Sequence, residues 1–416
     1  LRSTIIGNSI ANICEFQGFK TVRVNYFGDW GTQFGKLLLG YDKFGSEKKL
    51  QKNPIKHLLE IYVKANKESY EQEARDWFKK LETRDKKSLM LWKNFRDLSL
   101  EEFEKLYNLL GIKFDVYDGE SKYNLKTKQI IKELQDKKLL KESQGALVVN
   151  LEAYKLGTSL IQKSDGATLY ATRDIATAIS RHDKYKCERM IYSAGQEQKL
   201  HFEQFFKILE LMGYKWAKNC IHIDHGLYLD KSGKKFATRK GNIVFMEDII
   251  DKTKSLAKKE IQKRFPKLSK KELEKRSLKV ALAAIFYGDL KNNRTNNIVF
   301  DINRFVSFEG DTGPYIQYSY ARATSILKKT KNKDKFQVYN LDAKELELVK
   351  KLLEFPDIAS EAYRNLSPAV IAHYCQQLSK LFNEFYHACP VIGSEQEAFR
   401  LALVEAFRQI TKNATN

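Results

Sequence analysis

Residues 226–244 read GLYLDKSGKKFATRKGNIV, and the rest of the sequence is arranged around this stretch. One apolar run ends where it begins and another starts where it ends, so the segment between them is expected to be a loop. Its glycines permit a close approach to a ligand, and Lys235, Arg239 and Lys240 can neutralise the charge of a polyphosphate. A solvated basic turn has the same composition, so the loop acquires a function only through the motifs that accompany it.

The composition indicates a globular protein with a polyanionic partner. The chain has 416 residues, enough for two or three domains, and 43% of them are hydrophobic. The net charge of +21 favours nucleic acid, with an anionic membrane surface as the second candidate. No apolar run reaches the ~18 residues of a membrane span. The five cysteines lack metal-ligand spacing, so we expect a reduced intracellular compartment and no structural zinc.

The beginning of the sequence predicts half of a parallel α/β unit. Residues 1–14 carry apolar side chains at helical spacing, and Gly18 is expected to end that helix. Residues 20–26 then read as a buried strand. Because the predicted helix starts at the first residue and no initiating Met precedes it, we expect the sequence to be a fragment of a longer protein.

The predicted strand is followed by NYFGDWGTQFG at residues 25–35. The carboxyl edge of an open α/β sheet is where ligands bind, although three glycines also fit a tight turn from strand to helix. No chemical role for Asp29 or Gln33 follows from the sequence.

Residues 45–150 are mostly helical in pattern and predict a subdomain inserted between two α/β halves. Within it lies FDVYDGES at residues 114–121, and residues 145–150 predict a further strand. Glu120, taken alone, is an exposed turn carboxylate.

Residues 163–176, KSDGATLYATRDIA, predict a turn, a short strand and the start of a helix capped by Thr172. Asp174 would then lie in the first helical turn, where the helix dipole alone is a sufficient reason for an anion.

Two further strands are predicted, over residues 189–193 and 221–228, the second being the last of the sheet. His201, within AGQEQKLHF at residues 194–202, either faces a nucleotide or is a helix N-terminal histidine bonded to backbone. The backbone of Gly226 and Leu227 can accommodate adenine, because glycine lets a flat ring approach.

Residues 246–290 predict long helices, and their Lys-rich part fits either a solvated face or contact with an RNA backbone. From about residue 303 the pattern is entirely helical, beginning with FEGDTGPYIQY at residues 308–318. Tyr315 and Tyr318 are either helix-core aromatics or platforms on which bases stack.

These stretches resemble, in the same order, the motifs of arginyl-tRNA synthetases, a family of class I aminoacyl-tRNA synthetases. LRST at residues 1–4 matches the residues after the family's His-x-Gly-His motif, and residues 25–31 match its NYLGDWG block except at Phe27. Residues 235–241 resemble its MSTRKG signature loop, with Phe236 and Ala237 at the Met and Ser positions. The YxGES, YxTRD and GDTGPYxQY motifs are also present.

The resemblance implies a fold and a set of site residues. The fold is a Rossmann-like parallel-sheet catalytic domain over residues 1–300, with the mostly helical insertion, followed by an all-helical anticodon-binding domain over residues 301–416. Arginine would be bound by Glu120, Tyr170, Asp174 and Gln198, since paired carboxylates accept the planar guanidinium donors. ATP would be bound by His201, Gly226, Leu227, Lys235 and Lys240. Lys235, Thr238, Arg239 and Lys240 would act in catalysis, and Tyr315 and Tyr318 would bind tRNA.

The resemblance also implies a role in protein biosynthesis: arginine is activated by ATP and transferred to the 3′ end of tRNA(Arg), with release of AMP. The enzyme would position the arginine carboxylate for in-line attack on the α-phosphorus, while loop cations and the Mg²⁺ of the ATP complex stabilise the departing pyrophosphate. We expect a cytoplasmic monomer with no tightly bound cofactor, no metal held by the protein and no membrane partner.

Two other functions stay open at this point. A non-catalytic RNA-binding protein derived from a synthetase would fit a sequence without the His-x-Gly-His motif, and so would truncation. A synthetase for another amino acid is disfavoured by the two-carboxylate pocket. The codons upstream of Leu1 distinguish the enzyme from the binding protein.

Replacement of a signature-loop lysine, as Lys235→Ala or Lys240→Ala, should lower the rate of arginine-dependent pyrophosphate exchange. Arginine binding should change little, because the lost charge faces pyrophosphate and not the amino acid. Unchanged exchange in both variants would count against the role of the loop.

Overall fold

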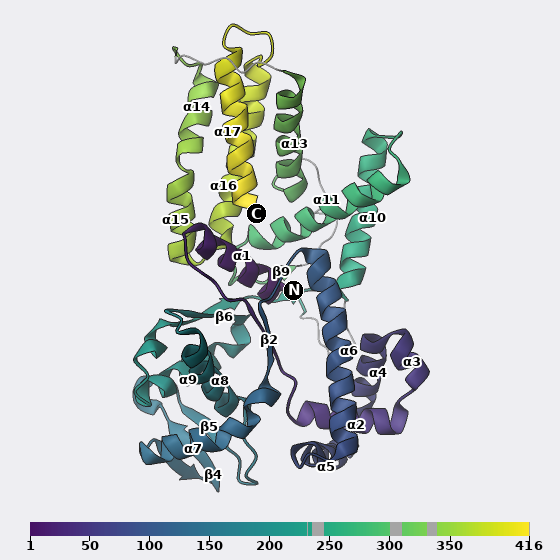
Figure 1. Cartoon of the computed structure of the whole chain (residues 1–416), viewed down its shortest axis with the longest axis vertical. Coiled ribbons are helices and arrows are strands. Elements are labelled where there is room, and N and C mark those ends of the chain that lie inside the picture. The colour runs from purple at the N-terminus through teal and green to yellow at the C-terminus, as the bar shows by residue number, and fades with distance from the viewer. Residues whose placement is uncertain (231, 235–244, 300–309, 331–338, 416) are drawn as a thin grey trace. The chain divides into compact units, whose positions relative to one another are not determined.

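The computed structural model describes residues 1–230, 232–234, 245–299, 310–330 and 339–415. The chain is divided into two compact units. The first, which we call the sheet unit, comprises residues 22–224, and the second, the helical unit, combines residues 1–21 with His225 to Lys234 and the chain from residue 245 onward. Most of the described elements are helices, and the sheets are small, which confirms the predicted class of an α/β domain followed by a helical domain. Figure 1 shows the elements of each unit.

The sheet unit contains three small sheets. The first pairs β1 with β2 in parallel, the second is the antiparallel set β3–β4–β5, and the third pairs β6 with β7. The strands are β1 (Val24–Phe27), β2 (Val116–Gly119), β3 (Leu140–Ser143), β4 (Ala146–Asn150), β5 (Thr158–Gln162), β6 (Met190–Gly195) and β7 (Cys220–His225). The strands expected over residues 20–26, 145–150 and 189–193 are thereby confirmed within a few residues.

Because parallel strands require a crossover connection, the chain leaves the sheet between β1 and β2. It forms α2 (Thr32–Phe44), α3 (Glu47–Lys52), α4 (Pro54–Ala65), η1 (Glu68–Tyr70), α5 (Glu71–Glu82) and α6 (Lys86–Leu110). These helices share an apolar core that includes Leu38, Ile61 and Phe95. The range 45–150 therefore returns to the sheet at β2, and only its first part is continuously helical.

The remaining helices of the sheet unit cover its other strands. They are η2 (Glu120–Lys126), α7 (Thr127–Asp136), η3 (Glu152–Tyr154), α8 (Tyr170–Tyr185), η4 (Gln196–Gln198), α9 (Lys199–Leu211) and η5 (Lys215–Asn219). A single apolar cluster joins α7, α8 and α9 through buried residues such as Leu134, Ile175 and Phe205. This core fixes the faces of α8 and α9 that carry the candidate site.

The helical unit consists of α1 and the helices that follow the last strands. Its helices are α1 (Arg2–Phe16), α10 (Met246–Arg264), α11 (Lys270–Leu290), α13 (Gly313–Lys329), α14 (Ala343–Leu353), α15 (Phe355–Asn365), α16 (Pro368–Ala388) and α17 (Glu397–Thr415). Helices α13, α16 and α17 and the column formed by α14 followed by α15 run side by side as a bundle (Figure 1). The bundle surrounds an apolar core that includes Leu378, Phe382 and Phe407. Gly18 follows α1 with φ of 88°, as expected for a residue that ends a helix.

The prediction of one strand over residues 221–228, the last of the sheet, was wrong. β7 ends at His225, and β8 (Tyr228–Leu229) is a separate short strand that pairs in parallel with β9 (Ile298–Val299). The strand breaks at Gly226, whose N–H donates to the carbonyl of Arg294 at 2.8 Å. A Cβ on Gly226 would lie 2.3 Å from the carbonyl oxygen of Asn296, so the crossing requires glycine.

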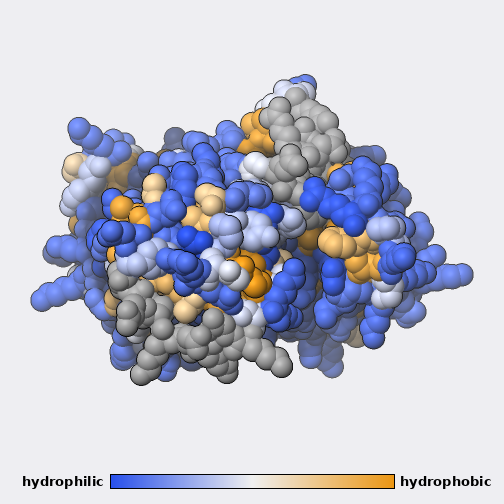
Figure 2. Space-filling view, turned by 90° about the horizontal axis from the view of Figure 1, so that it is seen from above, coloured by the Kyte–Doolittle hydropathy of each residue, from blue (hydrophilic) through white to orange (hydrophobic). Residues whose placement is uncertain are grey.

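The surface is mainly hydrophilic on the face shown in Figure 2, where apolar side chains occur in scattered groups. In the part of the chain that the structure describes, no helix has the length and apolar character that a bilayer crossing requires.

Candidate active site

The candidate site of the sheet unit lies where the β1–β2 pair meets α8. Phe27 pairs with Gly119, so Glu120 is the first residue beyond the paired strands. The chain after β1 lies close to it, because a Cβ added to Gly28 would be 3.6 Å from Oε1 of Glu120. The two motifs quoted for β1 and β2 are thus neighbours in space.

The start of α8 differs from the prediction. The helix begins at Tyr170 with Leu169 as its N-cap residue, and Thr172, which was expected to cap it, instead donates from its buried hydroxyl to the carbonyl of Ile161 at 2.6 Å. Asp174 consequently lies in the second turn, and the first turn contains no acidic residue. The helix dipole acts only over the first turn, so it does not account for Asp174.

The two acidic residues are each held by a basic side chain. Nε of Arg173 donates to Glu120 at 2.8 Å, and Nε2 of His201 lies 2.7 Å from Oδ2 of Asp174. The side chains of Glu120 and Asp174 are 16% and 21% exposed, which leaves both carboxylates accessible to a small ligand.

The electrostatics indicate that the two carboxylates act on the same region. Burial raises the pKa of Glu120; Arg173 opposes this, while the charge of Asp174 raises the pKa further. Burial likewise raises the pKa of Tyr26, and Asp174 and Glu120 both add to that increase. The Tyr26 hydroxyl lies 3.2 Å from Oγ1 of Thr177, one turn along α8 from Asp174's neighbour Arg173.

Asp29, to which the sequence assigned no role, organises the start of η2. Its carboxylate accepts hydrogen bonds from the Ser121 N–H at 2.9 Å and the Ser121 hydroxyl at 2.7 Å. Its carbonyl accepts a bond from the Trp92 indole at 2.7 Å, and the residue is 5% exposed. Asp29 therefore fixes the residue next to Glu120.

The other residues expected to bind arginine lie at the ends of α8 and α9. Tyr170 is 52% exposed, and its ring stands edge-on to His201 with centroids 4.7 Å apart. Gln198 is exposed at the N-terminal end of α9, close in sequence to His201. The structure thus brings Tyr170, Asp174 and His201 together. Glu120 is linked to this group by its ion pair with Arg173, the neighbour of Asp174 in the chain.

The expected nucleotide-binding residues Gly226 and Leu227 lie in the helical unit, and their backbone is engaged by the chain itself. The Gly226 carbonyl accepts from Nη1 of Arg2 at 2.7 Å and lies 2.9 Å from Nδ1 of His225. The Leu227 N–H donates to Oδ1 of Asn297 at 2.7 Å, and the Leu227 carbonyl accepts from the Ile298 N–H at 2.9 Å. These backbone groups already make hydrogen bonds within the chain. A nucleotide base at this segment would therefore make van der Waals contacts with it.

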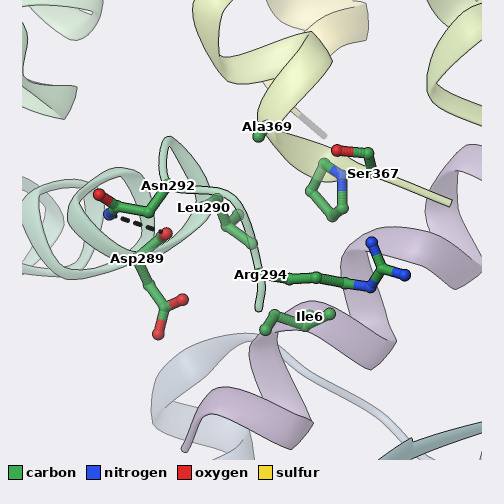
Figure 3. Close-up of a pocket in the computed structure, with 8 residues that line it drawn as sticks. Ile6, Asp289, Leu290, Asn292, Arg294, Ser367 and Ala369 are labelled. Carbon is green, nitrogen blue, oxygen red and sulfur yellow. Dashed lines mark hydrogen bonds between the residues drawn. The ribbon is translucent and has the colours of Figure 1, made fainter. Parts of the chain in front are cut away.

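A buried ion pair supports this segment. Nε of Arg2 lies 3.2 Å from Oδ1 of Asp289, and the Asp289 carboxylate also accepts from the Tyr228 hydroxyl. Next to the pair is a cavity of about 10 Å³, drawn in Figure 3, lined by Ile6, Asp289, Leu290, Asn292, Arg294, Ser367, Pro368 and Ala369. This volume holds about one water molecule, so the cavity is not a nucleotide site.

The four residues expected to act in catalysis, Lys235, Thr238, Arg239 and Lys240, lie outside the described residues. In the portions of the chain that are described, no group of His, Cys, Asp and Glu side chains has an arrangement that could hold a metal ion.

The tyrosines expected to bind tRNA differ in their surroundings on α13. Tyr315 is half-buried, and its hydroxyl accepts from Nδ2 of Asn383 on α16 at 3.0 Å. Tyr318 is 42% exposed, and Arg322 lies over its ring and over that of Tyr386, at 4.9 and 4.7 Å from the centroids. Tyr318 is the better candidate for stacking, and Tyr315 is part of the contact between α13 and α16.

Comparison with known proteins gives the class. The family described as "tRNA synthetases class I (R), catalytic domain" matches residues 1–302, and the "DALR anticodon binding domain" family matches residues 316–416. The fold and these matches define a class I aminoacyl-tRNA synthetase.

Individual relatives show which family of class I synthetases the chain resembles. The chain is 44% identical over 413 residues to the arginine–tRNA ligase of Pediococcus pentosaceus, covering 98% of this chain and 73% of that protein. It is 44% identical over 424 residues to the enzyme of Clostridium acetobutylicum, covering 100% and 75%. The crystal structure of arginyl-tRNA synthetase from Plasmodium falciparum superposes with a TM-score of 0.85 at 28% identity, covering 99% of this chain and 71% of that one. The chain belongs to the arginyl-tRNA synthetase family.

The contact between Asp29 and η2 is testable by a double-mutant cycle. A Cβ on Gly119 would lie 2.4 Å from the Asp29 carboxylate, although the backbone of Gly119, with φ of −143°, suits alanine. Gly119→Ala should lower the free energy of unfolding by about 1–3 kcal/mol through overpacking. In an Asp29→Ala background the same change should cost much less, because the carboxylate that it meets is gone. Additive losses in thermal or denaturant unfolding would contradict the contact.

Proposed function

We propose that this protein joins L-arginine to tRNA(Arg), first forming arginyl-adenylate from arginine and the Mg²⁺ complex of ATP. The observation that carries this proposal is the pair of carboxylates Glu120 and Asp174, each held by its own basic partner. Family membership and the identity to curated arginine–tRNA ligases support it.

Asp174 is the residue on which recognition of the guanidinium rests. The carboxylate is partly exposed, and its bond to His201 involves Oδ2, so other lone pairs remain for a ligand. Arginine presents parallel N–H donors in a planar fork, whereas lysine presents a compact point charge. Glu120 supplies a second acceptor of fixed position, because Arg173 and the adjacent Asp29–Ser121 contact limit its movement.

The chemistry requires positioning and charge stabilisation, and the protein supplies no nucleophile. The arginine carboxylate attacks the α-phosphorus, the bond to pyrophosphate breaks, and the ribose hydroxyl of the terminal adenosine of tRNA later displaces AMP. Holding the guanidinium end fixes the position of the reacting end. The cations of residues 235–240 would offset the charge that develops on pyrophosphate.

The partner tRNA is supported by the basic character of the chain and by its helical bundle. The net charge is +21, and non-specific attraction to phosphates scales with the number of cations in contact. We assign the catalytic domain to residues 1–300 and the anticodon-binding domain to residues 301–416. A monomer acting in the cytoplasm completes the proposal. All five cysteines lie in the described residues and none forms a disulfide, which agrees with a reducing compartment.

Asp174→Asn should raise the KM for arginine by about thirtyfold or more and change the KM for ATP far less. The substitution removes the charge that pairs with the guanidinium, and loss of one partner of such a pair costs about 2 kcal/mol or more. Asp183→Asn is the matched control, because Asp183 lies on the same helix with its side chain 68% exposed. Equal increases in both KM values would refute the assignment of Asp174.

Tyr318→Ala should weaken tRNA binding by about 1–3 kcal/mol if a base stacks on this ring, with the free energy of unfolding nearly unchanged because the ring is exposed. Tyr315→Ala is the comparison: it should mainly destabilise the bundle, since it removes the contact with Asn383. Filter binding and thermal unfolding of both variants separate the two roles; tRNA affinity that depends on Tyr315 alone would reverse them.

A further inference from the structure

The sequence suggests that His201 faces a nucleotide, but in the structure its side chain contacts Asp174. The two side chains are 11% and 21% exposed, and the atoms in contact are 2.7 Å apart. Aromatic rings surround the imidazole, with Tyr170 edge-on, Phe202 at 5.3 Å and Phe205 stacked at 6.0 Å between centroids. These contacts therefore fix the orientation of the imidazole, and its Nε2 points at the Asp174 carboxylate.

We propose that His201 is a positioning residue of the amino-acid pocket, which holds the Asp174 carboxylate and makes arginine binding depend on the protonation state of its imidazole. This inference rests on the proposed function, because it takes arginine as the ligand of Asp174.

A neutral imidazole suits the task. With the proton on Nε2, His201 donates to Oδ2 of Asp174 and fixes the plane of the carboxylate without adding a charge. The carboxylate keeps its full negative charge and its remaining lone pairs, and it can accept the paired donors of a guanidinium.

A charged imidazole would compete with the ligand. The carboxylates near Asp174 are Glu120 from η2 and Asp29 beside it, and Glu82 of α5 faces Arg173. The basic groups are Arg173 and, over the Tyr26 ring, Arg181, both from α8. The tyrosines near Asp174 are Tyr26 from β1, Tyr170 from α8 and Tyr192 from β6. Strands β6 and β7 also pack against α9 through Tyr192 and His222, whose rings contact Phe202. The charged residues of η4 and η5, Glu197, Lys215 and Lys218, are exposed to solvent.

Protonation of His201 would therefore cancel a negative charge that the guanidinium uses. Arginine binds the form with neutral His201, so its affinity should fall when acidification adds a proton to the imidazole. By linkage, arginine binding at the lower pH should release up to about one proton, and its Kd should rise by up to about tenfold per pH unit.

The test is calorimetric titration of the full chain with arginine at about pH 6 and pH 8, in buffers that differ in ionisation enthalpy, which counts the protons released. The decisive variant is His201→Gln, whose amide nitrogen can replace Nε2 as a donor but does not titrate. It should bind arginine about as tightly as the parent at the higher pH and should lose both the pH dependence and the proton release. His201→Leu, which has no donor, should bind arginine about fivefold or more weakly at the higher pH.

His222→Gln is the matched control. His222 stacks on the same Phe202, with centroids 4.1 Å apart, but its Nε2 lies 3.3 Å from the carbonyl of Ala194. This variant should keep the pH dependence of the parent.

The outcomes separate the inference from the function on which it rests. If the parent chain binds arginine and His201→Gln keeps the proton release, or if His201 variants weaken ATP binding and leave arginine binding intact, the positioning role is refuted. A parent chain that binds lysine as well as it binds arginine would instead overturn the proposed function.

Discussion

The candidate site depends on how the protein accommodates two partly buried carboxylates, Glu120 and Asp174, which act on each other electrostatically. Two carboxylates that act on each other in a half-buried site are unfavourable unless basic groups offset their charge. Arg173 supplies such a group to Glu120 at 2.8 Å, and His201 holds Asp174 by a hydrogen bond at 2.7 Å. The four side chains come from η2, α8 and α9, and the shared apolar core of these elements keeps them together. Besides stabilising the fold, this apolar core therefore keeps the Glu120 and Asp174 carboxylates close to each other.

Much of the fold could be predicted from periodicity, and much of the site from motifs. What could not be predicted was which groups meet. Asp29 lies in a recognisable block, but its bond to Ser121 depends on the pairing of β1 with β2 across the whole helical crossover. Arg173 stood within a quoted motif without a role, because its partner Glu120 is distant in sequence. The misplaced start of α8 has the same origin: Thr172 prefers the carbonyl of Ile161, a tertiary partner, to the capping position.

The helical unit shows the same dependence of a glycine on distant residues. The motif leads one to expect that Gly226 admits a ligand, yet the close approach that it permits is to Asn296 of the same chain. Arg2 then donates to the carbonyls of both Gly226 and Asn296, at 2.7 and 2.8 Å, and pairs with Asp289. A lysine, with one ammonium, could not reach all three acceptors from one position. The first helix, the segment before the signature loop and the end of α11 are consequently joined through one guanidinium.

The raised pKa of Glu120 gives a physical reason why the proposed site would favour a cation. Burial, opposed by Arg173, raises the pKa above its ordinary value, so the stability linked to this group is fully present below the ordinary pKa and is lost as the pH rises through the folded-state value. At neutral pH the ionised Glu120 thus costs the folded protein free energy, and Asp174 adds to that cost. A guanidinium bound as we propose would offset that cost for both carboxylates at once, because a ligand that binds only the folded state stabilises that state. In the proposed site, selectivity for a guanidinium and the electrostatic cost of the two carboxylates would have one physical cause, the proximity of two negative charges.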